Sequence, residues 1–357
     1  MAINPDVLAT ALVDLQPKFS ALFTKWHPIL DRIVKGGNVQ RKALQGYQLE
    51  FTVLTDGPGA VTQIMSGNEV LAGGRRQNAH RGLAEASRMI YHFDVPGIDL
   101  ALANGEMDLA EILKNYPTAG LDDFYERMAS QIGTGNGSEV GGFTTLNGDT
   151  NYNPAGTQRE GALDFATAAN QNQAVFGLMK QGGASGISGW YNQYANITDF
   201  GLNGRRRMRE VYFECSRQGR SSGPVDLMLG DPASYLNYLD DLDEHVRTTK
   251  VENDHVPGNV RQGVKFLEAD FFLEEAIDTS APAFTARNGV IYFLKTNTWR
   301  LFTAGHNAKM ETKGFFDTRG PIRIPEQDMW RYELVLHMGL YCNQLRANGC
   351  VDGSAVE

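Results

Sequence analysis

Apolar residues recur at helical spacing through residues 5–35, which predicts a long amphipathic helix near the start of the chain. Pro17 and Pro28 are expected to break or kink this helix, and Gly36-Gly37 to end it. Its apolar positions include Leu12, Leu15, Phe19, Phe23 and Trp26. Two interpretations of this stripe are equally favoured: the helix packs on its own domain, or it is an arm that lies on a neighbouring subunit.

A strand is predicted over residues 47–53, where apolar and polar side chains alternate with a period of two. A second β-like segment spans residues 87–97, and residues 56–82 between the two are loose and punctuated by glycine. We predict that the two segments form a long β-ribbon with a poorly structured tip. Because a two-stranded ribbon is marginally stable in water, it needs another surface to lie on.

A long helix is predicted over residues 106–132, with Pro117 and Gly120 interrupting it and a kink near Tyr116. Near the other end of the chain, residues 328–342 alternate as an unusually long strand with one apolar face. That face needs an equally long partner, and the helix over 106–132 is the predicted one.

The middle of the chain mixes short helices and strands. A helix over residues 201–217 is expected to turn Met208, Val211, Tyr212 and Cys215 inward. A second helix is predicted from Pro232, behind Asp231, to about residue 247. A short buried strand is predicted at residues 225–229, and short strands at residues 265–267, 271–276 and 290–294.

Composition narrows the classes of protein to consider. A length of 357 residues suggests two or three domains, and a net charge of −9 argues against a nucleic-acid binder. The odd count of 3 cysteines, without zinc spacing, favours reduced thiols over a disulfide framework. The sequence has no apolar run long enough for a membrane span and no secretory signal.

The glycine-rich stretch QIGTGNGSEVGG, residues 131–142, is the first candidate for cofactor binding. It fails both the dinucleotide and the phosphate-loop spacing, and a predicted helix precedes it, so a flexible linker is favoured. The histidines do not form a metal-ligating motif, and no serine lies in a nucleophile elbow. We therefore expect no catalytic, cofactor-binding or metal site, and no enzyme.

Two basic clusters remain to be explained: Arg75, Arg76 and Arg81 near the ribbon tip, and Arg205, Arg206, Arg207 and Arg209 at the start of a helix. A solvated face and ion pairing across subunits are equally favoured, and nucleic-acid contact ranks third because of the net charge. Arginine suits carboxylate contacts between subunits because its guanidinium binds both oxygens. The acidic partners would be residues such as Asp240, Asp241, Asp243 and Glu244.

The order of predicted elements resembles the major capsid protein of tailed double-stranded DNA bacteriophages, which has the Hong Kong ninety-seven fold. Local segments agree with this resemblance: FGLMKQGGASGISGWYNQY, RRRMREVYFECSRQG followed by VDLMLGDPASYLNYLDDL, NGVIYFLKTNTWRLF, and LYCNQLRANGCVDG. The resemblance covers residues 40–352 and lies more in the order of elements than in identical residues.

The resemblance implies an α+β phage major capsid fold. Its parts would be an N-terminal arm (1–45), an extended β-hairpin loop (46–98), a peripheral domain with a long spine helix (99–144 and 313–357) and an axial domain (145–312). The glycine-rich stretch would then be a hinge-like junction between the spine helix and the axial domain. A kinked spine helix would be a place to store strain during shell expansion.

The implied function is self-assembly into hexamers and pentamers of an icosahedral shell that encloses the phage genome. The implied partners are further copies of the chain, a scaffolding protein, a portal, an optional decoration protein, and DNA contacted weakly and without sequence specificity, with no membrane. The protein would reside in the virion, and in the host cytoplasm during assembly. Because the sequence begins at Met1, we expect the scaffolding protein to be a separate chain.

Some members of this family crosslink a lysine to an asparagine of the next subunit. Lys35, Lys42, Asn343 and Asn348 are available by type, but nothing in the sequence selects a pair. Three alternatives stay open at this point: an encapsulin-like nanocompartment, a soluble α/β enzyme, and a tail or head-completion protein. Assembly into closed particles would favour a capsid or an encapsulin-like nanocompartment over an enzyme or a tail or head-completion protein.

Overall fold

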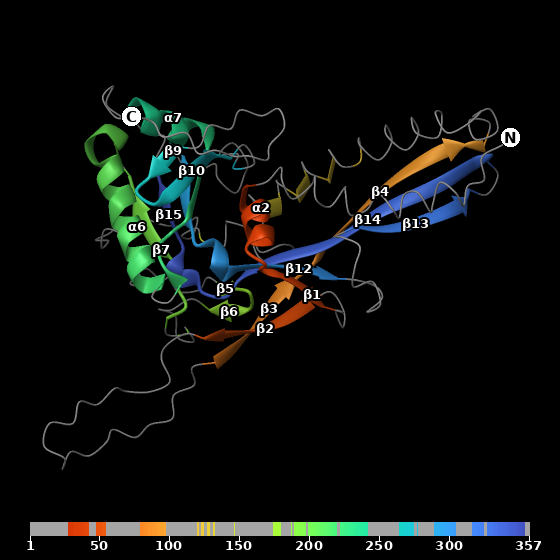
Figure 1. Cartoon of the computed structure of the whole chain (residues 1–357), viewed down its shortest axis with the longest axis horizontal. Helices are drawn as coiled ribbons and strands as arrows, with labels where there is room; N and C mark the ends of the chain where they lie inside the picture. Colours follow the sequence, from red (N-terminus) through yellow and green to blue (C-terminus); the bar gives the residue numbers. More distant parts are fainter. Residues whose placement is uncertain are drawn as a thin grey trace, which may run out of the picture.

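The computed structural model has two β-sheets at its centre, with helices packed on them (Figure 1). It describes residues 28–42, 48–54, 79–97, 120, 123–124, 127–128, 131–132, 146, 174–179, 187, 189–197, 199–219, 222–241, 264–274, 277, 289–304, 316–324 and 327–353.

Six of the described strands form a mixed sheet. Their order is β7 (Gln193–Asn196), β15 (Gly349–Asp352), β11 (Val290–Leu294), β8 (Leu227–Gly230), β10 (Ala269–Leu273) and β9 (Val264–Phe266). β7 runs parallel to β15 and β8 parallel to β10, while the other neighbours are antiparallel. All residues of β8 and β11 are buried, as expected for central strands with both faces covered.

Two helices cover one face of this sheet. α6 (Arg205–Gly219) buries Met208, Val211, Tyr212 and Cys215, which confirms the predicted inward face. α7 (Pro232–Asp240) begins at the predicted proline but ends at Asp240. The helix was predicted to continue to about residue 247. That prediction is wrong, because Asp241 forms the C-terminal cap of α7.

The two helices lie side by side, because both contact the ring of Phe266. The ring centroid of Phe266 lies 6.0 Å from that of Tyr212 on α6 and 5.9 Å from that of Tyr238 on α7. These aromatic side chains belong to one buried cluster with the facing residues of the sheet. α6 and α7 thus form a single helical layer on the six-stranded sheet.

A second sheet contains five of the described strands: β1 (Val39–Lys42), β12 (Trp299–Ala304), β14 (Met329–Cys342), β13 (Phe316–Arg323) and β4 (Ser87–Pro96). β4 pairs with β14 from Met329 to Met338 along one edge. β13 and then β12 pair with successive halves of its other edge. The far half, β4–β14–β13, extends away from the six-stranded sheet as a ribbon (Figure 1).

The predicted ribbon between residues 47–53 and 87–97 is wrong in its pairing, although both strands exist. β2 (Gln48–Leu54) pairs with β3 (Ala79–Glu85), and the second predicted strand, β4, joins the five-stranded sheet. Gly82 allows the pairing, because a Cβ there would lie 2.6 Å from the ring of Phe51. A period of two identifies a strand but does not identify its partner.

The hairpin of β2 and β3 does lie on another surface, as the sequence requires. Phe51 packs against Tyr341 of β14, with ring centroids 4.2 Å apart, and against Phe176 at 5.6 Å. Phe176 joins β5 (Ala174–Val175) to β6 (Leu178–Met179), and its carbonyl oxygen accepts a hydrogen bond from Leu83 N at 2.9 Å. These contacts supply the support that an isolated hairpin lacks.

The N-terminal helix is described only as α2 (Pro28–Lys35). It ends where predicted, with Gly37 in the left-handed region at φ 67°. Asn38 N donates to Ile33 O at 3.0 Å and Gly37 N to Val34 O at 3.1 Å, which is a Schellman termination. The rest of the predicted helix, including Pro17, lies outside the described residues.

The predicted long helix is described at residues 120, 123–124, 127–128 and 131–132, all of which are helical. Gly120 does not interrupt it: it is buried, and a Cβ there would lie 2.3 Å from the ring of Tyr91 on β4. Phe124, one turn later, lies 6.3 Å from the same ring. Glycine therefore serves close approach of the helix to the sheet, and the expected kink at Tyr116 lies outside the described residues.

Near the end of the chain, sheet membership crosses the ranges that the resemblance implies at two points. β12, within the range 145–312, pairs with β14 in the five-stranded sheet. β15, within the range 313–357, pairs with β7 and β11 in the six-stranded sheet. The chain therefore passes between the sheets twice near its end, once between β11 and β12 and once between β14 and β15.

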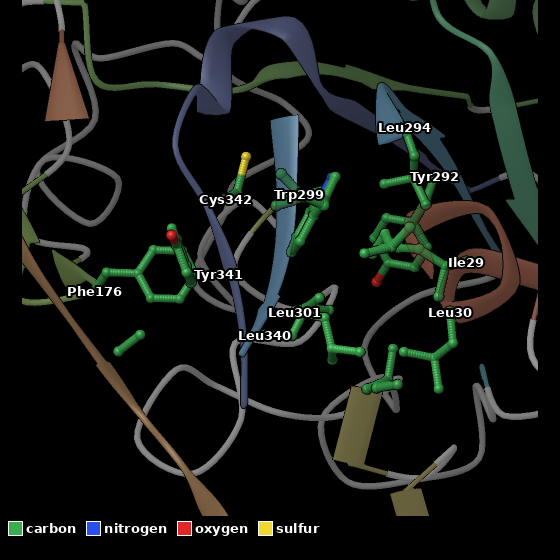
Figure 2. Packing of buried hydrophobic residues seen from close by; sticks show 14 of the residues in the cluster. Ile29, Leu30, Phe176, Tyr292, Leu294, Trp299, Leu301, Leu340, Tyr341 and Cys342 are labelled. Carbon is green, nitrogen blue, oxygen red and sulfur yellow. The ribbon is translucent and has the colours of Figure 1, made fainter. Parts of the chain in front are cut away.

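The hydrophobic core is continuous where the two sheets meet. Figure 2 shows Ile29 and Leu30 of α2 beside Tyr292 and Leu294 of the six-stranded sheet, and close to Leu301 of β12. Trp299 lies between this group and Cys342 (Figure 2). α2 thus occupies the angle between the sheets.

Candidate subunit-interaction surfaces

The basic cluster lies at the N-terminal end of α6, where a helix dipole disfavours positive charge. The structure compensates each of its first three arginines with an acid of the same chain. Arg205 pairs with Asp241, and Arg206 and Arg207 contact Glu210 at 2.9 and 3.1 Å. Two acids of the same chain thus pair with three of the four arginines of the cluster.

The ion pair of Arg205 and Asp241 joins the start of α6 to the end of α7. The basic segment at the start of α6 and the acidic segment at the end of α7 do attract each other, as their charges indicate. This ion pair, however, forms within one chain and not between subunits. Asp240 is exposed at the last residue of α7, while Asp243 and Glu244 lie outside the described residues.

The outward side of the helical layer carries large apolar side chains. Leu202, in the π-helical turn before α6, is 84% exposed; Phe213 on α6 is 59% exposed and Leu236 on α7 is 57% exposed. We call the exposed residues Leu202, Arg206, Arg209, Phe213, Leu236 and Asp240 the α6–α7 outer surface. A surface of this kind, apolar with charged neighbours, is typical of a protein–protein contact.

The turn after β9 continues this surface. Leu267, with φ 55°, is half exposed, and the backbone of Glu268 hydrogen-bonds the hydroxyl of Tyr212. Burial raises the pKa of Tyr212, Tyr235 and Tyr238, so these hydroxyls stay neutral in the physiological range. They pack and hydrogen-bond, and they are not poised to exchange protons.

A second candidate surface is the solvent face of the β4–β14–β13 ribbon. The pairing of β4, β14 and β13 places Asp94, Arg331 and Ile322 side by side across the three strands. It does the same for His92, Glu333 and Arg319. Arg331 donates two hydrogen bonds to Asp94, at 2.8 and 3.0 Å. These bonds, more than the Coulomb attraction, lower the pKa of Asp94.

The third candidate surface is on the hairpin of β2 and β3. Arg81, predicted as an interface candidate, forms an exposed ion pair with Glu50 across the hairpin. Gln48 donates to Glu85 at 2.8 Å on the same pair of strands. Exposed pairs contribute little stability. Arg75 and Arg76 lie outside the described residues, as do Leu12, Leu15, Phe19, Phe23 and Trp26.

Asn348 is not accessible for crosslinking, because it is fully buried at the junction of the sheets. Its side-chain oxygen accepts from Lys295 N at 2.8 Å and Trp299 Nε1 at 3.0 Å, and its amide donates to Thr298 Oγ1 at 3.0 Å. Lys35 pairs with Asp31 on its own helix, 2.6 Å apart.

The three cysteines are unpaired, as predicted, and they are buried. Burial raises the pKa of Cys342 to about 12 and that of Cys215 well above its usual range, which keeps both as thiols. Among the described residues, no three His, Cys, Asp or Glu side chains are grouped to hold a metal ion. No described helix combines the length and apolar character needed to cross a membrane.

The two sheets, the long strand β14 and the helical layer define the fold of the described residues. No protein-family model matches the sequence, and no curated protein does. Among solved structures, the chain is similar to the capsid protein of cyanophage A-1(L), with a TM-score of 0.60 and 12% identity, over 89% of this chain and 90% of that chain.

Two further structures are similar. The capsid of an empty GTA particle matches with a TM-score of 0.51 and 10% identity, over 89% of this chain and 88% of that chain. The SrpI encapsulin of Synechococcus elongatus PCC 7942 matches with a TM-score of 0.49 and 10% identity, over 92% and 88%. The resemblance to phage capsid proteins is therefore confirmed for the fold, which is what identities this low establish.

Proposed function

We propose that this chain is the major capsid protein of a tailed double-stranded DNA bacteriophage. It assembles into hexamers and pentamers of an icosahedral shell. The observation that carries the proposal is the match to the cyanophage A-1(L) capsid over nine-tenths of both chains. The protein then acts by binding copies of itself, in the host cytoplasm during assembly and afterwards in the virion, and not as an enzyme.

The parts of the fold are assigned by their strand pairing. The six-stranded sheet with α6 and α7 is the axial domain, which includes β15. The five-stranded sheet is the peripheral domain, which includes β12, and the helix that approaches Tyr91 is its spine helix. The hairpin of β2 and β3 is the base of the extended loop, and the N-terminal arm is the segment 1–45.

The α6–α7 outer surface is the proposed contact between neighbouring axial domains. Its apolar residues are more than half exposed in the single chain. Burying such side chains stabilises an assembly by about 25 cal/mol per Å² of apolar area. Closed symmetry then repeats each modest contact many times.

The remaining partners follow from the shell assignment. A scaffolding protein and a portal take part in assembly, and a decoration protein is an optional addition. The net charge of −9 disfavours tight binding of DNA, so the genome contacts the shell weakly and without sequence preference.

Electron microscopy of the purified, negatively stained chain tests the proposal. Closed particles with hexameric units are the expected result, and uniform small oligomers, rings or tubes would contradict it. Particles isolated from the natural source should protect DNA from nuclease. Particles that contain protein cargo and no DNA would support assembly into a shell. They would contradict the proposed role in enclosing a phage genome.

A further inference from the structure

α2 is fastened to both sheets by polar contacts in addition to its apolar face. On the side of the six-stranded sheet, Arg32 Nη1 donates to Asp226 O at 3.0 Å, and Arg32 Nη2 forms an ion pair with Asp270 of β10. The guanidinium also lies 5.9 Å from the ring centroid of Phe272. One side chain thus makes three contacts with this sheet.

On the side of the five-stranded sheet, the fastening is Asn38, the residue after the helix end. Its carbonyl oxygen accepts from Leu301 N at 3.1 Å, and its side-chain oxygen accepts from Arg300. β1 begins at the next residue and runs parallel to β12. α2 is therefore held at one point to each sheet, and its apolar residues fill the space between (Figure 2).

The same region contains both passages of the chain between the sheets. The first, from Lys295 to Thr298, is held by Asp226, whose carboxylate accepts from Thr296 N at 2.8 Å and from Thr296 Oγ1. The second runs from Asn343 to Asn348. Asn343 N donates to Thr298 O at 3.0 Å, and the side chain of Asn348 bonds to the first passage. The two passages are thus bonded to each other.

Arg32 binds the main chain of Asp226, the residue whose side chain holds the first passage. We propose that α2 is a clip that fixes the angle between the two sheets, and that Arg32 is its releasable contact. The side chains of Arg32 and Asp270 are 27% and 15% exposed, so water reaches the pair. An ion pair of this kind opens more readily than the buried apolar contacts of Ile29 and Ile33.

The consequence is a route from α2 to the junction. Because Arg32 contacts Asp226, and the carboxylate of Asp226 holds Thr296, release of Arg32 acts on the passage at Thr296. This inference does not depend on the proposed function, since it concerns the angle between two sheets of one chain.

Hydrogen exchange, followed by mass spectrometry on the full chain, tests the clip. We compare the wild type with Arg32→Met, which keeps an apolar stem but removes the guanidinium. The control is Lys35→Met on the same helix, whose ion pair is with Asp31 of α2 itself. All proteins are brought to the same assembly state, checked by size-exclusion chromatography.

The expected result for Arg32→Met is exchange about tenfold faster or more in segments 295–298 and 343–348, with segment 227–230 of β8 unchanged. Lys35→Met should match the wild type. Uniform acceleration across the chain, or none at the junction, would overturn the proposal. If Arg32→Met does not fold, Asp270→Asn removes the pair from the other side, with the same two outcomes.

Discussion

At the scale of single residues, the charged pairs differ in how firmly the structure holds them. Arg81 and Glu50 are both more than half exposed on the hairpin, and pairs of this kind contribute little. Asp94 and Arg331 are held by two parallel hydrogen bonds across adjacent strands. The fixed geometry of that pair makes it the one whose loss should be measurable.

The Asp94 pair should make the stability of the ribbon depend on pH. The folded-state pKa of Asp94 is lowered, first by the hydrogen bonds from Arg331. Its contribution is therefore present above the unfolded pKa of about 3.9 and is lost as pH falls through the folded value. We expect Asp94→Asn to lower the urea midpoint at pH 7, and the gap from the wild type to narrow as the pH falls below about 3.9.

Arg331→Gln is the matched variant for this test. It should reproduce the loss at pH 7, and the double substitution should lose less than the sum of the two. A gap that is constant between pH 7 and pH 3 would show that Asp94 acts through packing and not through its charge.

At the scale of elements, close approach of a helix to a strand depends on one glycine. The helix that contains Gly120 lies on β4 with its backbone almost touching Tyr91. Phe124, Met128 and Ile132 follow on the same face and are buried. A side chain at position 120 would push the first described turn away from the sheet.

Gly120→Ala tests this approach with two opposed effects. Alanine favours a helix over glycine by about 1 kcal/mol. A Cβ at 2.3 Å from a ring carbon must displace a packed tyrosine, and overpacking of this kind costs about 1–3 kcal/mol. We expect a net loss of up to about 2 kcal/mol in the free energy of unfolding, measured by chemical denaturation.

The control for Gly120→Ala is Gly201→Ala. Its added Cβ would meet only Asp199 Oδ1, at an ordinary 3.5 Å. Stability should therefore change little there. Stabilisation by Gly120→Ala would mean that the helix can move away from β4 at no cost.

Local patterns predicted these elements better than their partners. The inward face of α6, the start of α7 and the buried strand β11 follow from periodicity and one proline. The pairing of β2 with β3, and the transfer of β4 to β14, did not follow. A period of two shows which side of a strand is buried but is silent about the strand beside it.

At the scale of the whole molecule, local sequence patterns also failed to identify the partners of residues on the candidate surfaces. Pairing of Arg205 with an acid such as Asp241 across subunits was one of two equally favoured interpretations, yet the two residues meet within the chain. Phe213 lies about 100° around α6 from the buried Tyr212, and its side chain is exposed. Nothing within the single chain explains why a large apolar side chain is exposed there. A contact with a neighbouring copy, which would bury Phe213, would explain it.

The last prediction concerns assembly through the α6–α7 outer surface. Because Phe213 is 59% exposed, Phe213→Ser should change the free energy of unfolding by less than about 0.5 kcal/mol. If the surface joins neighbouring copies, the same substitution should strongly reduce the yield of closed particles seen by microscopy and sedimentation, since a ring repeats the lost contact at every interface. Phe213→Leu, which keeps an apolar side chain, should assemble close to the wild type. A stable Phe213→Ser protein that assembles normally would remove this surface from the interface, while wild-type shells would still support the proposed function.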